Sequence, residues 1–266
     1  MNIFIAETGR QQVSAFDRAV QFGDAHFTTA KIHDGKVCLF DLHKQRLQIA
    51  SERLQFAAIS WQTVWQAMQN EALKKQFGVI KVVISRGESQ RGYAGLGCEA
   101  NVYLFVSDRP QTLLDNMQQG INLEQVEFKL GHQPILAGLK HCNRLEQVLI
   151  KNELMQRNLL DGLVFDLNNS LIETSVANIF LFRQGEWQTP LLDKAGINGV
   201  LRQHIMNKFK AENQTIKEIE IHQSRLNEIS SAFICNALIG IVPVIKLAGI
   251  KMNTTLVEQV KNSVEY

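Results

Sequence analysis

The stretch PILAGLKHCNRLEQVLIKNEL, residues 134–154, places a lysine between an apolar run and a predicted helix. Lys140 directly follows residues 134–139, where Gly138 is the one break in the apolar side chains. Lysine is rarely buried without a reason. Two interpretations fit the position. The stem packs while the ammonium reaches water, or the amine is desolvated and acts as a nucleophile that bonds carbonyl groups.

The residues after Lys140 predict an amphipathic helix. Asn143 followed by Glu146 has the spacing of a capping box, with Asn143 as the N-cap. Apolar side chains then recur at helical spacing at Leu145, Val148, Leu149 and Leu154. Lys140 would lie just ahead of the helix N-terminus, where burial and the helix dipole both lower the pKa of an ammonium group. This position suits a nucleophile, but for this stretch taken alone the packed stem with its ammonium in water is the more common outcome.

Composition limits the class of protein. The chain has 266 residues, of which 45% are hydrophobic and 20% charged, and a formal net charge of +2. This balance argues against nucleic acid or a membrane surface as a partner. The four cysteines form no CxxC pair and the histidines no HExxH pair, so we expect a reducing compartment and no metal site. The N-terminus MNIFIAETGR lacks a basic leader, and no apolar run approaches the roughly 18 residues of a membrane span. We therefore predict a cytoplasmic protein.

The order of predicted elements indicates an α+β fold. We predict a strand at 2–6 and a hairpin at 27–40, with Asp34-Gly35 as its turn. Helices at 41–59 and 61–77 follow, and then strands at 78–86 and 100–107. After the helix at Asn143 we predict a run of short strands, many joined by tight turns. A helix at 200–211 interrupts this run. This pattern, without GxGxxG, excludes a Rossmann array. We predict a small N-terminal domain at 1–107, a linker at 108–117, and a larger C-terminal domain at 118–266 that carries Lys140.

Three small-residue stretches are candidates for a phosphate cradle: 174–178 (TSVAN), 195–202 (AGINGVLR) and 235–240 (CNALIG). In the second, two glycines lead into a helix, so that backbone N–H groups and the helix N-terminus face an anion. Each stretch taken alone is more often a turn than a binding site.

Two charged residues complete the candidate site. Glu173 ends an apolar strand, where its carboxylate either faces solvent or holds a proton on the ring nitrogen of a pyridine cofactor. Arg46, in the helical segment LHKQRL, either lies on a solvated face or binds phosphate.

The ordered set of motifs resembles the fold-type IV pyridoxal-phosphate enzymes, which include branched-chain and D-amino-acid aminotransferases and aminodeoxychorismate lyases. It is most similar to the lyases, and it runs through nearly the whole chain: FGDAHFTTAKI (22–32), KVVISRGESQRGY (81–93), AGLKHCNRLEQVLI (137–150), ETSVANIF (173–180) and ICNALIGIVPV (234–244). One departure is Ala25, where the family often has glycine.

The resemblance implies two α/β domains with pyridoxal 5'-phosphate in the cleft between them, and a homodimer. Lys140 would bond the cofactor and move protons, and Glu173 would pair with the ring nitrogen. The phosphate would be held by Arg46 and by the backbone at Asn198, Gly199, Val200, Asn236, Ala237 and Leu238. Arg91, Tyr93 and Thr28 would bind the substrate, with Thr28 also catalytic.

The resemblance also implies a reaction, the conversion of 4-amino-4-deoxychorismate to 4-aminobenzoate and pyruvate in folate biosynthesis. Two alternatives stay open at this point. An aminotransferase of the same fold would use the same lysine and glutamate. In a non-enzymatic binding protein both residues would be structural.

Overall fold

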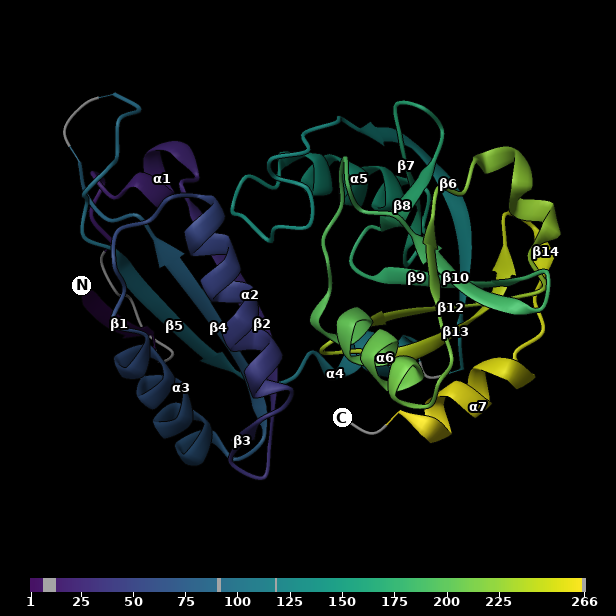
Figure 1. The fold of residues 1–266 in the computed structure, drawn as a ribbon, viewed down its shortest axis with the longest axis horizontal. Coiled ribbons are helices and arrows are strands. Elements are labelled where there is room, and N and C mark those ends of the chain that lie inside the picture. Colours follow the sequence, from purple (N-terminus) through teal and green to yellow (C-terminus); the bar gives the residue numbers. More distant parts are fainter. Residues whose placement is uncertain (7–12, 90–91, 118, 265–266) are drawn as a thin grey trace. The chain divides into compact units, whose positions relative to one another are not determined.

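The computed structural model describes residues 1–6, 13–89, 92–117 and 119–264, and its contacts divide the chain into two units (Figure 1). Unit 1 is Met1–Arg109 with Leu139–Asn143, and unit 2 is Pro110–Gly138 with Arg144–Tyr266. The break after Arg109 is close to the predicted domain end at residue 107. Two features differ from the prediction. The predicted linker contains helix α4, Gln111–Met117, and the segment with Lys140 belongs to unit 1.

The sheet of unit 1 has the strand order β1-β5-β4-β2-β3. Its strands are β1 Asn2–Ala6, β2 Ala25–His33, β3 Lys36–Val37, β4 Gly78–Ser85 and β5 Asn101–Ser107. β1 runs parallel to β5, and the other neighbours are antiparallel. Asp34 and Gly35 have φ values of 49° and 69° between β2 and β3, which confirms the predicted hairpin turn.

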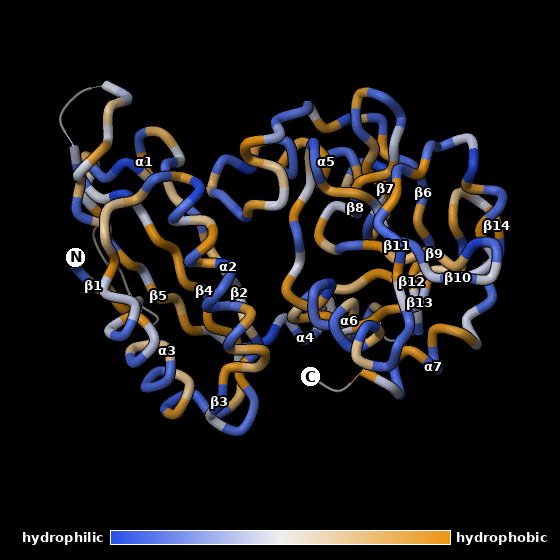
Figure 2. The backbone as a smooth tube through the Cα atoms, viewed as in Figure 1, coloured by the Kyte–Doolittle hydropathy of each residue, from blue (hydrophilic) through white to orange (hydrophobic). Residues whose placement is uncertain are grey.

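Two helices cover one face of this sheet, α2 Phe40–Arg53 and α3 Trp61–Lys75, and the short α1 Arg18–Phe22 precedes β2 (Figure 1). Figure 2 shows hydrophobic residues along β2, β4 and β5. Alternate residues of these strands, such as Ile32 and Val82, pack against Leu47, Val64 and Met68 of the helices. This is the alternation expected of a sheet with one buried face.

Unit 2 is a mixed sheet in the order β11-β10-β9-β12-β13-β6-β7-β8, with β14 paired to β13. Its strands are β6 Ile121–Leu130, β7 Gly162–Asp166, β8 Leu171–Thr174, β9 Asn178–Arg183, β10 Glu186–Pro190, β11 Lys217–Ile219, β12 Ser231–Asn236, β13 Gly240–Leu247 and β14 Ile250–Lys251. β6 is parallel to both β7 and β13, whereas β12 is antiparallel to β9 and β13. The predicted α+β class is confirmed.

The helices of unit 2 that follow α4 are α5 Leu145–Gln156, α6 Val200–Ala211, the 3-10 helix η1 Gln223–Glu228 and α7 Thr255–Ser263. α6 has the bounds that its sequence predicts. Three aromatic residues of the sheet itself pack together: the rings of Phe180 (β9) and Phe233 (β12) stack with centroids 4.7 Å apart, and Trp187 (β10) meets Phe233 edge-on at 5.0 Å. Within the described ranges, no helix has the length and apolar character to cross a membrane.

The predicted capping box before α5 is wrong. The helix begins at Leu145 with Arg144 as N-cap, and no side chain caps it. The Asn143 side-chain amide instead donates to the Gly23 carbonyl at 3.2 Å, and the Glu146 carboxylate accepts from the Gly131 amide at 3.2 Å. Both side chains have partners distant in sequence, and these outweigh the local cap.

The apolar stripe of α5 is also not the buried one that its spacing predicts. Leu154 is fully buried, but Leu145 is 78% exposed and Val148 and Leu149 are each 51% exposed. Ile150 shares the buried side with Leu154. The helix therefore presents apolar side chains to the outside as well as to the core.

Candidate active site

Lys140 lies on a short segment that pairs with the start of β2. The Phe27 amide donates to the Lys140 carbonyl at 2.9 Å, and the Cys142 amide donates to the Ala25 carbonyl at 2.8 Å. Because β4 pairs with the opposite edge of β2, the segment occupies the edge that β3 leaves open. The half-buried Lys140 places its Nζ atom 4.7 Å from the Phe27 ring centroid, a cation–π contact. The backbone thus fixes the start of this side chain.

Thr28 lies on the other face of β2 from Phe27. It is fully buried, and its Oγ1 atom is 2.6 Å from Nδ1 of His43 on α2. Burial, with a smaller effect from Arg46, lowers the pKa of His43 to about 3. This geometry gives no support to the predicted substrate contact of Thr28. By strand alternation, Thr29 shares the face of Phe27, on which Lys140 packs.

Arg46 follows His43 by one turn of α2. Burial lowers the pKa of its guanidinium to about 10, so the group is shielded from water yet charged at neutral pH. A cation on a solvated helix face would show no such effect. A partly buried guanidinium of this kind is compatible with an anion partner, and the phosphate role of Arg46 stays a prediction.

Glu173 does not face solvent. It lies on β8 opposite Val164 of β7 and is 6% exposed. Its Oε2 atom accepts a hydrogen bond from the Ile197 amide at 3.0 Å. A carboxylate has lone pairs enough to accept from this amide and from other donors as well, a protonated ring nitrogen among the possible kinds.

The loop that holds Glu173 is also tied to the approach to Lys140. The Gly138 amide donates to the Gly196 carbonyl at 2.9 Å, and the Asn198 amide donates to the Gly138 carbonyl at 3.1 Å. Ile197, between these two residues, is the donor to Glu173. One loop therefore sets the position of the glutamate and of the residue two places before the lysine.

The N-terminus of α6 is the sharpest anion cradle that the described residues offer. Gly199 is the N-cap, and its amide donates to Oδ1 of Asn178 at 3.0 Å. The Asn178 side-chain amide donates back to the Ile197 carbonyl at 2.8 Å. A Cβ atom at Gly199 would collide with Asn178 Oδ1, so this close approach requires glycine. The amides of the first turn of α6, which begins at Val200, point out of the helix N-terminus, where an anion could accept hydrogen bonds from them.

The turn after β12 joins the same region. Asn236 Oδ1 accepts from the Leu238 amide at 2.9 Å and from the Ile239 amide at 3.0 Å, which shapes the turn through Ala237. The Asn236 side-chain amide donates to the Val176 carbonyl at 3.1 Å. Through Val176 and Asn178, all three predicted small-residue stretches are hydrogen-bonded together. Asn178 ends the motif TSVAN but was not predicted as a site residue.

Each unit, taken by itself, carries groups that suit the cofactor that the sequence implies. Pyridoxal phosphate needs a carboxylate for its ring nitrogen, backbone amides and a cation for its phosphate, and a lysine for its aldehyde. Unit 2 supplies the buried Glu173 and the glycine-capped N-terminus of α6. Unit 1 supplies Lys140 and Arg46.

Two predicted substrate residues lie in the loop between β4 and β5. Tyr93 is 85% exposed, and its ring centroid is 5.3 Å from that of Phe22. Arg91 is outside the described residues. The predicted roles of both stay predictions.

The two curled mixed sheets, the lysine paired to β2 and the buried glutamate beside a glycine-capped helix have the architecture of fold-type IV pyridoxal-phosphate enzymes. A family model described as amino-transferase class IV matches residues 25–247. The chain belongs to this family.

Individual relatives show which members of the family this chain is similar to. An aminodeoxychorismate lyase from Vibrio harveyi is 33% identical over 229 residues, covering 86% of this chain and 84% of the relative. A D-alanine aminotransferase from Listeria innocua is 20% identical over 259 residues, covering 95% of this chain and 88% of the relative.

Solved structures agree with this fold. The 4-amino-4-deoxychorismate lyase from Pseudomonas aeruginosa has a TM-score of 0.90 and 28% identity, covering 96% of this chain and 94% of its own. The branched-chain aminotransferase from Escherichia coli has a TM-score of 0.84 at 18% identity, covering 94% and 88%. The latter likeness concerns the fold alone.

Proposed function

We propose that this protein is a pyridoxal-phosphate-dependent lyase that converts 4-amino-4-deoxychorismate to 4-aminobenzoate and pyruvate. The single observation that carries the cofactor chemistry is the loop at 196–198, which bonds both Glu173 and the approach to Lys140. The choice of lyase over aminotransferase is supported by the Vibrio harveyi lyase, which is 33% identical, against 20% for the Listeria innocua aminotransferase. Four free cysteines suit the reducing cytoplasm that we propose as its location.

Pyridoxal phosphate, when bound, supplies an electron sink for charge that develops beside the substrate nitrogen. Glu173 would hold the proton on its ring nitrogen. Arg46 and the backbone at Val200 and Ala237 would hold its phosphate. The neighbouring amides of Asn198, Gly199 and Leu238 donate within the protein and shape the cradle. Lys140 would bond its aldehyde in the resting enzyme, with its backbone and its Nζ atom placed against Phe27.

The proton transfers fall to Lys140. The Lys140 amine would be the base that removes the hydrogen from ring carbon 4 of the substrate. The carbon–oxygen bond at the neighbouring ring carbon then breaks, and the oxygen leaves with the enolpyruvyl group. That group takes up a proton and becomes pyruvate, while the substrate ring becomes aromatic. The Phe27 ring restricts the Lys140 amine and excludes water from one side of it.

The reaction itself gives a direct test. Purified protein given 4-amino-4-deoxychorismate, with no keto acid added, should release 4-aminobenzoate and pyruvate in equal amounts over many turnovers. No keto acid is needed because the amino group stays on the product. Rapid amino exchange between D-alanine or a branched-chain amino acid and 2-oxoglutarate, with no pyruvate from 4-amino-4-deoxychorismate, would make the protein an aminotransferase. Failure to take up pyridoxal phosphate would leave only the binding-protein alternative.

We further propose that the protein is a homodimer, and that α5 lies in the contact between copies. Three apolar side chains on one side of this helix are exposed: Leu145, Val148 and Leu149. Met155 on the same helix is 75% exposed, and Ile135 in unit 2 is 70% exposed. Several exposed apolar side chains on one helix face are typical of an interaction surface. The family resemblance identifies a second copy of the chain as the partner.

Leu149→Glu should therefore convert the dimer to a monomer, because a charge would be buried in an apolar contact. Sedimentation velocity at micromolar concentration measures the change. Leu73→Glu is the matched control, since Leu73 on α3 is similarly exposed, at 60%, but lies in unit 1. A wild-type protein that sediments as a monomer, or equal dissociation by both variants, would contradict the proposed contact.

A further inference from the structure

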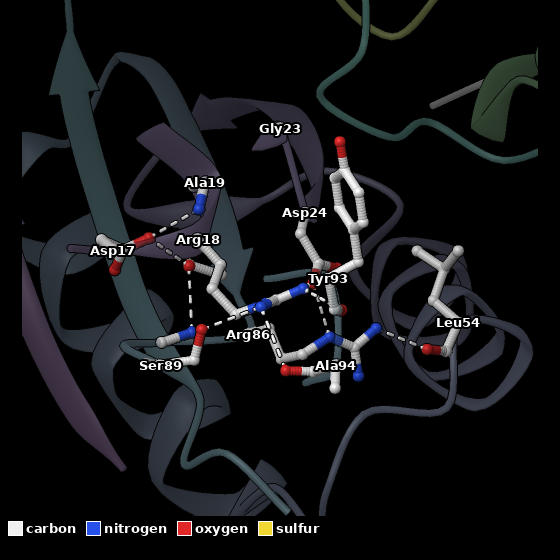
Figure 3. Close-up of polar contacts among 12 residues, drawn as sticks. Asp17, Arg18, Ala19, Gly23, Asp24, Leu54, Arg86, Ser89, Tyr93 and Ala94 are labelled. Carbon is white, nitrogen blue, oxygen red and sulfur yellow. Dashed lines mark hydrogen bonds and ion pairs between the residues drawn. The ribbon is translucent and has the colours of Figure 1, made fainter. Parts of the chain in front are cut away.

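Arg18, the first residue of α1, is buried at 3% exposure among oxygen acceptors (Figure 3). Its Nε atom donates to Oδ2 of Asp24 at 2.8 Å. Its guanidinium carbon lies 4.9 Å from the Phe22 ring centroid. A buried cation is costly unless it is paired and hydrogen-bonded. The partners that offset this cost show what the side chain holds in place.

The remaining donors of Arg18 are directed at the loop between β4 and β5. Nη1 donates to Ser89 Oγ at 2.8 Å and to the carbonyls of Gly92 at 3.2 Å and Ala94 at 3.3 Å. Nη2 donates to the Tyr93 carbonyl at 2.7 Å. One guanidinium thus serves five acceptors, three of them successive carbonyl groups, which a lysine ammonium with its three donors could not match.

Asp24 links this arginine to a second one. Its Oδ2 atom also accepts from Nε of Arg86 at 2.7 Å, and Arg86 donates to the carbonyls of Leu54 and Gln55 at 2.7 and 2.8 Å. Burial acts to raise the pKa of Asp24, but hydrogen bonds from Arg86 and Arg18 outweigh it and hold the pKa below its usual value. The carboxylate therefore stays charged and keeps both guanidinium groups in place.

The loop backbone lies directly against the two arginines at Gly95. A Cβ atom there would come within 2.6 Å of Arg86 Cδ and 2.8 Å of Arg18 Nε. An alanine at this position would have to displace the loop or a guanidinium group. The contact is therefore sensitive to a single methyl group.

Tyr93 is the residue that this arrangement presents. Its carbonyl is fixed by Arg18, whereas its side chain is 85% exposed. Figure 3 shows the ring pointing away from both guanidinium groups. A fixed backbone under an exposed aromatic side chain is suited to recognition, because little entropy remains to be lost when the ring meets a ligand.

We propose that Arg18 is a positioning residue for substrate recognition, holding the backbone of residues 92–94 so that the Tyr93 side chain meets the substrate in a set geometry. The inference rests on the proposed function, in which the substrate is a cyclic amino acid with two carboxylates. The Tyr93 hydroxyl is the group that would donate to one of those carboxylates. Arg18 itself touches neither substrate nor cofactor.

Arg18→Lys keeps the charge and loses the planar fork. It should raise KM for the amino substrate about tenfold, the effect of losing one or two hydrogen bonds. The kcat should stay within about twofold, because the lysine and glutamate of the reaction are untouched. The cofactor absorption spectrum should be unchanged for the same reason. Arg157→Lys is the matched control, since Arg157 also donates to a carbonyl, that of Gln125 in unit 2. A KM for Arg18→Lys equal to that of the control would overturn the proposal.

Two further variants separate positioning from a general loss of structure. Gly95→Ala, which leaves Arg18 in the chain, should raise KM in the same way, and an unchanged KM would count against the anchor. In a Tyr93→Ala background, Arg18→Lys should add little to KM, because the group it positions is gone. Additive effects of the two changes would show that Arg18 acts elsewhere.

A last measurement needs no substrate. Amide hydrogen exchange at residues 92–94 should be faster in Arg18→Lys than in the wild type, and equal rates would overturn the anchor whatever the protein acts on. Absence of pyruvate in the lyase assay would instead overturn the proposed function. The KM comparison could then be made with the amino substrate that the protein does turn over.

Discussion

Lys140→Ala protein is expected to lose turnover by roughly 10³-fold or more, because in the proposed function one residue would both bond the cofactor and move protons. The fold should survive. The Phe27 amide bonds the Lys140 carbonyl, and the Cys142 amide bonds the Ala25 carbonyl, and neither contact involves the lysine side chain. Multiple-turnover release of pyruvate measures the loss, and circular dichroism checks the fold.

Chemical labelling tests the same assignment in the wild type. Reduction with borohydride followed by peptide mapping should place the pyridoxyl group on Lys140. Lys151→Ala is the control for turnover, since its Nζ atom makes an exposed hydrogen bond to the Leu160 carbonyl at 3.0 Å. Label on Lys129 or Lys151 would refute the role of Lys140.

Glu173→Gln is expected to lower kcat about 100-fold while changing cofactor affinity much less. Glutamine has nearly the same shape, and its carbonyl can still accept from the Ile197 amide, so the 196–198 loop should keep its position. A neutral amide, however, does not keep a ring nitrogen protonated, and the electron sink weakens. Steady-state kinetics at saturating cofactor and a separate cofactor titration give the two quantities.

Arg46→Ala is the counterpart that makes the Glu173 result specific. It removes a charge-assisted phosphate contact and should weaken cofactor binding more than kcat. Equal effects of both substitutions on both quantities would contradict the division of roles between ring nitrogen and phosphate.

Local patterns predicted most elements of the fold but failed where distant partners compete. The Asp34-Gly35 turn and the bounds of α6 follow from nearest neighbours alone. Asn143 and Glu146 have the spacing of a cap, yet each has a partner far away in the chain. Thr28 shows a second limit. On a strand, a shift of one residue exchanges the buried face for the exposed one, and the motif FTT does not say which threonine faces outward.

Periodicity and motif order also left functions unassigned. The spacing of Leu145, Val148 and Leu149 identifies an apolar helix face but not whether a core or a second chain covers it. Asn178 and Arg18 were missed as supporting residues because their partners, at 197–199 and at 89–94, lie too far along the chain for any short motif. Lys140 and Glu173, by contrast, stood out as charged side chains at the ends of apolar runs.

The return of Leu139–Asn143 to unit 1 has a consequence for synthesis on the ribosome. When Arg109 has emerged, β2 can pair with β3 and β4, but the Ala25 carbonyl and the Phe27 amide still lack the partners that Cys142 and Lys140 provide. Unit 1 therefore stays incomplete, with an open strand edge, until part of unit 2 has also been made. A gene fragment that stops at Arg109 would encode a domain with that edge exposed for good, and its product should aggregate instead of folding alone.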